Sequence, residues 1–193
     1  MVEYQRKDRY DINDLRDIMS ILRSPQGCPW DREQIHKSIR NDFIEEVYEA
    51  IEAIDLEDTE LLKEELGDVL LQIIFHCRIE EEKSCFDFDD ICDELCKKLI
   101  IRHPHVFGDI TVSDSGEVLK NWDSIKKETK GQTSYTETLT SVAKSLPALM
   151  RAQKVGKRAM RAGMDFSCVS DAVERVKSET DELEEAILSL IHI

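Results

Sequence analysis

The feature that most constrains the fold is a pair of long helical patterns joined by a short turn. Apolar residues recur at helical spacing from about residue 32 to 55, and again from about 59 to 83. Asp58 or Thr59 is suited to cap the start of the second pattern. Because only about five residues separate the two patterns, the helices are expected to pack as an antiparallel hairpin.

The rest of the chain adds helical patterns and no alternating strand pattern. The expected helices cover about residues 14–23, 87–102, 118–130, 146–162 and 168–190. Only seven Gly and four Pro interrupt 193 residues. The predicted fold class is therefore all-α.

Four acidic residues stand beside the apolar stripes of the hairpin. The first stripe is Phe43, Val47, Ala50, Ile51 and Ile54, and the second is Leu62, Leu66, Val69, Leu70, Ile73, Ile74 and Cys77. Glu46 and Glu49 are displaced from the first stripe in the same rotational sense as Glu65 and Asp68 from the second. In an antiparallel pair this places all four on one flank of the seam.

Such a flank offers oxygen ligands from two helices. Carboxylates at i,i+3 on each helix suit Mg²⁺ or Mn²⁺, which prefer octahedral oxygen donors. Gly67, inside the second helix, indicates close approach of backbone or ligand beside these acids. The alternative is that the acids form an ordinary solvated helix face, and the pattern leaves it open.

The charge balance excludes some partners. Forty-one acidic and 26 basic residues give a net charge of −15. This argues against general binding to nucleic acid or anionic membrane, because both need clustered Lys and Arg. No signal peptide or membrane-spanning stretch is visible, so a cytoplasmic location is expected.

Several stretches, in this order, resemble the MazG-type nucleoside triphosphate pyrophosphohydrolases. They are GCPWDREQIH (27–36), EEVYE (45–49), EELGDVLLQIIFH (64–76), RHPHVFGD (102–109), NWDSIKKE (121–128) and KSLPALMRAQKVGKR (144–158). The resemblance implies an all-α, MazG-like helical bundle that forms a homodimer. It also implies Mg²⁺-dependent hydrolysis of nucleoside triphosphates to monophosphate and pyrophosphate.

The resemblance carries roles to particular residues. It implies metal ligands at Glu46, Glu49, Glu65 and Asp68. Glu45, the first residue of the EExxE motif, is implied as a ligand of a second metal or as a base that positions water. The expected cofactor is Mg²⁺, with Mn²⁺ as a possible substitute.

Substrate contacts are implied at four further residues. Lys98 and Arg102 would hold phosphates, although cations at a helix C-terminus also suit the helix dipole. Family members often carry two basic residues before HPHVF, whereas this chain has Ile101 and Arg102, so one contact is in doubt. Trp30, near Gln34 in a Pro-rich turn, would contact the base, and anchoring of the turn to the core is its alternative.

The C-terminal part reads as an incomplete second repeat. Residues 163–166 echo residues 27–30, and Glu179 and Glu182 match the rotational offsets of Glu46 and Glu49. The expected organisation is a catalytic domain at 1–130, a linker at 131–143 and a partial repeat at 144–193. No second ExxD helix follows before Ile193. Natural truncation, a degenerate copy and an artificial boundary all remain open.

Two functions are therefore predicted. The first is a Mg²⁺-dependent nucleoside triphosphate pyrophosphohydrolase in which a metal-activated water attacks phosphorus. The alternative is a catalytically weak helical dimer that senses nucleotide or binds a partner. Turnover of nucleotide distinguishes the two.

Overall fold

The computed structural model describes residues 4–129, 131 and 134–191, and in these residues the regular structure is helical throughout. Residues 130, 132 and 133, at the predicted domain end and linker, lie outside the described residues, as do residues 1–3, 192 and 193. The helices are α1 (Ile12–Leu22), α2 (Pro29–Glu33), α3 (Arg40–Asp55), α4 (Thr59–Glu81), α5 (Phe88–Arg102), α6 (Pro104–Phe107), α7 (Ser115–Thr129), α8 (Tyr135–Thr140), α9 (Ala148–Arg161) and α10 (Val169–Ile191). The all-α prediction is confirmed.

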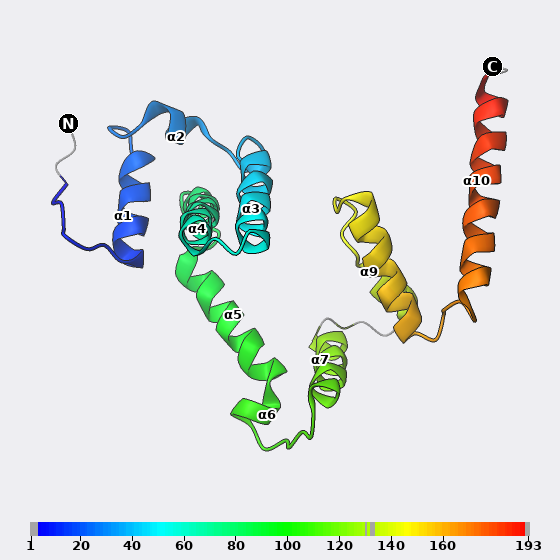
Figure 1. Ribbon diagram of the computed structural model, residues 1–193. Coiled ribbons are helices and arrows are strands. Elements are labelled where there is room, and N and C mark those ends of the chain that lie inside the picture. The colour runs from blue at the N-terminus through cyan, green and yellow to red at the C-terminus, as the bar shows by residue number, and fades with distance from the viewer. Residues whose placement is uncertain (1–3, 130, 132–133, 192–193) are drawn as a thin grey trace. The chain divides into compact units, whose positions relative to one another are not determined.

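The chain divides into two compact units, at residues 1–100 and 101–193. In the first unit α4 lies between α1 and α3 (Figure 1). The core is formed by large apolar side chains from α1, from the residue before α3, and from α4. They are Met19, Ile39, Ile74, Phe75 and Ile79. Burial of these apolar side chains stabilises the packing of α1 and of the start of α3 on α4.

The predicted hairpin is present, but its first helix begins at Arg40 and not near residue 32, and its turn is shorter than expected. Residues 56–58 connect α3 to α4. Glu57 adopts a left-handed conformation, with φ of 55°, and Asp58 donates its backbone N–H to the Ala53 carbonyl oxygen at 3.1 Å. The Asp58 side chain then accepts from the backbone N–H groups of Glu60 and Leu61. The turn ends one helix and caps the next, which fixes their register.

The predicted apolar stripe of α3 is buried at Ala50 and exposed at several of its large residues. Ala50 and Ala53 are buried, whereas Val47 and Ile51 are 40% and 44% exposed. On α4, Leu66 is also exposed. Small alanine side chains let α3 approach α4 closely, so the larger apolar residues of α3 face outward. Of the four predicted acids, Glu46, Glu65 and Asp68 are half-buried and Glu49 is exposed.

Arg23, at the end of α1, joins three segments of the first unit. Its guanidinium donates to both carboxylate oxygens of Glu82 at 2.9 and 2.8 Å. It also donates to the backbone carbonyl oxygens of Asp31 and Gln34 and lies 5.3 Å from the Phe75 ring centroid. The Arg23 side chain is buried. A single cation therefore ties the α2 segment to the end of α4.

The second unit contains a helix inside the predicted linker. Ser134 caps α8 in a reciprocal capping box with Glu137, and α8 packs against α9. Arg158 of α9 donates to the Thr138 carbonyl oxygen and to Ser141 Oγ, and Val142 is buried. The linker sequence therefore continues into folded structure, while the domain end at residue 130 stays a prediction.

Candidate metal and nucleotide site

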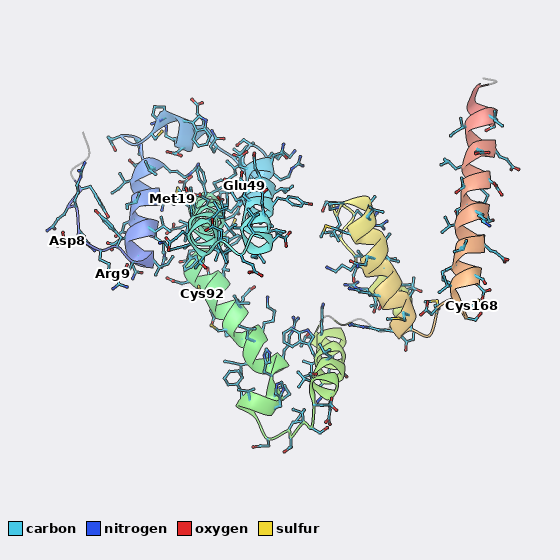
Figure 2. All side chains as sticks on the ribbon, viewed as in Figure 1. Asp8, Arg9, Met19, Glu49, Cys92 and Cys168 are labelled. Atoms are coloured by element: carbon cyan, nitrogen blue, oxygen red, sulfur yellow. The ribbon has the colours of Figure 1, made fainter. Side chains whose placement is uncertain are left out.

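Three carboxylates from two helices meet at the α3–α4 seam. Glu46 and Glu49 of α3 and Glu65 of α4 each place one carboxylate oxygen within 4.8 Å of the others. Figure 2 shows Glu49 on the opposite side of α4 from Met19 of the core. Asp68 lies one turn beyond Glu65, and its charge acts on Glu46. The structure thus brings the four predicted acids into one neighbourhood, with three in ligand range of one another.

All the charged residues that change the pKa of Glu46 are acidic. Burial raises the pKa of the Glu46 carboxyl, and the negative charges of Asp68, Glu49 and Glu65 raise it further. The pKa of Glu65 is raised by the same kinds of cause, burial first and then Glu49. Because these pKa values are raised in the folded chain, ionisation above the ordinary value of 4.5 works against folding.

This donor set fits a divalent cation. It consists of oxygen atoms only, which Mg²⁺ and Mn²⁺ prefer. A bound cation would also remove the mutual repulsion that raises the pKa of Glu46. The acids sit on two helices whose register is fixed by the turn at residues 56–58, so their separation is set by the fold.

The other predicted site residues are more scattered. Glu45 is exposed on α3, next to the acidic cluster in sequence. Trp30 is 59% exposed at the start of α2. Gln34 uses its Nε2 to donate to the Trp30 carbonyl oxygen at 2.9 Å, so its amide holds the turn.

The two predicted phosphate contacts lie one turn apart on α5. Lys98 is exposed in the first unit, whereas Arg102 belongs to the second. The Arg102 guanidinium lies over the Trp122 ring, 5.5 Å from its centroid, and His103 meets the same ring edge-on. Stacking on Trp122 is a contact that the sequence did not predict.

Glu179 and Glu182 do not form a second acidic site in the described part of the chain. Both are exposed on α10. Arg175 pairs with Glu179 at 2.5 Å and lies 3.9 Å from Glu182. No third His, Cys, Asp or Glu among the described residues joins them as a metal-ligand group.

A polar ridge on α4 was not predicted. Asp68, Gln72, His76 and Glu80 follow one another at intervals of four residues, which places them on one face of the helix. Gln72 and His76 interrupt an apolar run, and that interruption was the available signal. Their partners lie on distant segments, so the sequence could not identify what they contact.

Two histidines and Glu80 form a connected group at the far end of this ridge. His36 and His76 share a 2.7 Å contact between their Nδ1 atoms, and His36 Nε2 pairs with Glu80. Lys83 and His36 hold the pKa of Glu80 down at about 2. Burial, and then the neighbouring His36, lower the pKa of His76.

These shifts predict loss of stability on acidification. A histidine whose pKa is lowered by folding contributes stability that is present above its ordinary pKa of 6.5 and is lost as the pH falls below it. The contribution of His76 to the free energy of unfolding should therefore decrease as the pH falls below about 7, whereas Glu46 and Glu65, whose pKa values are raised, contribute with the opposite sign. His76→Gln should flatten this decrease in urea unfolding, and Lys37→Gln, an exposed neighbour of His36, should not. An equal slope in wild type and His76→Gln would contradict the assignment.

The fold and the acidic cluster define an all-α protein with a candidate divalent-metal centre. Residues 34–107 match the family model described as the MazG nucleotide pyrophosphohydrolase domain. The nucleoside triphosphate pyrophosphohydrolase of Escherichia coli K12 is 44% identical over 173 residues, which cover 89% of this chain and 66% of that protein. The nucleoside triphosphate pyrophosphohydrolase/pyrophosphatase MazG of Thermotoga maritima is 42% identical over 175 residues, covering 91% and 67%.

A solved structure agrees with these relatives. The mazG-related protein from Thermotoga maritima superposes with a TM-score of 0.51 at 25% identity, over 60% of this chain and 99% of that one. The chain belongs to the MazG family of nucleotide pyrophosphohydrolases. It spans about two thirds of the length of the curated relatives described above. Among the described residues, no helix is both long and apolar enough to cross a membrane.

Proposed function

We propose that this chain hydrolyses nucleoside triphosphates to nucleoside monophosphate and pyrophosphate. The observation that carries the proposal is the convergence of Glu46, Glu49 and Glu65 from two helices, with Asp68 beside them. Mg²⁺ is the proposed cofactor, with Mn²⁺ as a substitute, because the donors are all carboxylate oxygens. The names of the Escherichia coli and Thermotoga maritima relatives support the reaction.

The proposed site residues have different roles in the reaction. The four acids would hold the cation, which when bound offsets phosphate charge and lowers the pKa of a bound water. Glu45 stands next to Glu46 and is exposed, so its carboxylate is available to accept a proton from the attacking water. Lys98 and Arg102 are proposed to hold phosphates, and Trp30 to contact the base, with Gln34 shaping its turn.

We also propose that the chain acts as a homodimer in the cytoplasm. α3 presents Ile44, Tyr48, Ile51 and Ile54 to solvent, each at least 44% exposed. An apolar face of this kind on a helix favours burial against another protein surface. Ile51→Glu should therefore shift the chain toward monomer in sedimentation analysis, while Glu52→Gln on the same helix should not.

Product analysis tests the reaction. Incubation with a panel of nucleoside triphosphates and Mg²⁺ should release pyrophosphate and monophosphate in equal amounts. Release of orthophosphate without pyrophosphate would overturn cleavage between the α and β phosphates. Nucleotide binding without turnover would favour the alternative, a nucleotide sensor.

A further inference from the structure

Gln72 is a buried amide on α4, the helix that carries Glu65 and Asp68 of the acidic cluster. It is 7% exposed, and its Oε1 atom has no hydrogen-bond partner among the described residues. Buried polar atoms in proteins are nearly always hydrogen-bonded, because an unpaired buried carbonyl loses its water and gains nothing in return. An orphaned acceptor at this position therefore calls for a physical explanation.

The position of Gln72 on α4 puts it on the helix face that also carries Asp68. Gln72 follows Asp68 by four residues and precedes His76 by four, so it lies on the same face as both. His76 packs against Phe43 of α3, with ring centroids 5.6 Å apart, while Asp68 acts on Glu46. Along α4, Gln72 thus lies between the turn whose His76 packs on Phe43 and the turn whose Asp68 acts on Glu46.

The direction of the side chain follows from helix geometry. Side chains of an α-helix lean toward its N-terminus and cover the preceding turn. For Gln72 the preceding turn on this face contains Asp68, which brings the amide toward the level of Glu46. The opposite direction leads to the His36–His76 group, whose imidazole hydrogen bonds join the two rings to one another and to Glu80.

The acids themselves cannot satisfy this oxygen. Ionised carboxylates only accept hydrogen bonds, and the Gln72 carbonyl oxygen also only accepts. A molecule that binds among them can supply the missing donor. Water bound to a divalent cation has this property, because its oxygen faces the cation and both of its hydrogens point outward.

We propose that Gln72 Oε1 accepts a hydrogen bond from a water molecule on the metal held by Glu46, Glu49, Glu65 and Asp68. Gln72 is then a positioning residue that acts on the hydration of the metal and does not ligate it. This inference rests on the proposed metal site. It assigns a ligand-dependent role to a side chain that lies in the stretch 64–76 but that was given no role by the resemblance or by a relative's name.

Manganese binding without nucleotide tests the inference, with free Mn²⁺ followed by electron paramagnetic resonance. Gln72→Met keeps the length of the side chain and removes the acceptor. It should weaken Mn²⁺ binding about tenfold, as loss of a partner of bound ligands does in other metal sites. Gln72→Glu keeps an acceptor oxygen at the same reach and should bind at least as tightly as wild type. Glu49→Gln, which removes a proposed ligand, should weaken binding more than Gln72→Met does.

The metal-free melting temperature separates this role from a structural one. Removing an unsatisfied buried oxygen should leave the metal-free melting temperature of Gln72→Met equal to or above that of wild type. A lower metal-free melting temperature with unchanged Mn²⁺ affinity would mean that the amide has a structural partner, and the inference would be wrong. Should Gln72→Met fail to fold, Gln72→Asn, whose amide is one methylene shorter, makes the same comparison.

The experiment distinguishes failure of the proposed role of Gln72 from failure of the proposed metal site. Unchanged Mn²⁺ binding in Gln72→Met, with weakened binding in Glu49→Gln, overturns the role of Gln72 and leaves the metal site standing. Unchanged binding in both variants overturns the metal site itself. Weakened binding in both, with recovery in Gln72→Glu, supports the inference.

Discussion

Asp68→Asn should reduce pyrophosphate release from nucleoside triphosphates about a thousandfold or more. The substitution keeps the size of the side chain and removes one negative charge from the acidic cluster. If the carboxylates hold the catalytic cation, loss of one ligand charge removes several kcal/mol of transition-state stabilisation, and each 1.4 kcal/mol is about tenfold in rate. Initial rates of pyrophosphate release at saturating Mg²⁺ measure the effect.

Glu52→Gln is the matched control for this experiment. Glu52 is an exposed acid on α3 and is absent from the acidic cluster. Its substitution should leave the rate within about twofold of wild type, since surface substitutions away from sites have small effects. Circular dichroism should show the same helix content in both variants. Near-normal turnover by a folded Asp68→Asn would exclude Asp68 from the catalytic machinery.

Arg23→Ala should lower the free energy of unfolding by about 2–3 kcal/mol. The substitution leaves Glu82 without its bidentate partner and removes one donor from each of two backbone carbonyl oxygens, on Asp31 and Gln34. The Asp31 oxygen keeps its hydrogen bond from the Gln34 backbone N–H. Breaking a buried pair typically costs about 3–5 kcal/mol, and the partial exposure of Glu82 reduces that figure. Urea unfolding of the two proteins at neutral pH measures the difference.

Arg78 offers a direct comparison, because it pairs with the same carboxylate. Its Nε lies 3.2 Å from Glu82 Oε1, in an i,i+4 pair near the surface of α4. Arg78→Ala should cost less than about 1 kcal/mol. If Arg23→Ala and Arg78→Ala lowered the free energy of unfolding equally, the burial of Arg23 and its two carbonyl contacts would contribute nothing to stability.

The helices of the first unit were predictable because their signals are local. The period of apolar residues identified both helices of the hairpin, and the short connection identified their antiparallel pairing. Asp58 was recognisable as a cap because a capping side chain contacts backbone only two or three residues away. The acidic residues were placed on one flank by periodicity alone.

The centre of the α3–α4 contact was not predictable from hydrophobicity. Large apolar residues dominate the predicted stripe of α3, which included Ala50 and left out Ala53. Close approach of two helices instead depends on small side chains, and the exposed Ile51 belongs to a surface that a single chain leaves uncovered. Which apolar face packs inside the chain is decided by the partner helix.

Contacts across long sequence separations were also missed. His36 meets His76, and Arg23 meets Glu82, at separations of 40 and 59 residues. Neither pair follows a spacing rule within one helix. The sequence showed that Gln72 and His76 break an apolar run, whereas their surroundings depend on how the helices pack.

The melting temperature with and without Mg²⁺, at about pH 8, tests most directly whether the acidic cluster holds a cation. Saturating Mg²⁺ should raise the melting temperature of wild type by about 5 °C or more, because binding to the folded chain relieves the repulsion among Glu46, Glu49 and Glu65. Glu49→Gln should melt above wild type without Mg²⁺ and gain less from it. An unchanged wild-type melting temperature in saturating Mg²⁺, with or without nucleotide, would contradict the metal site.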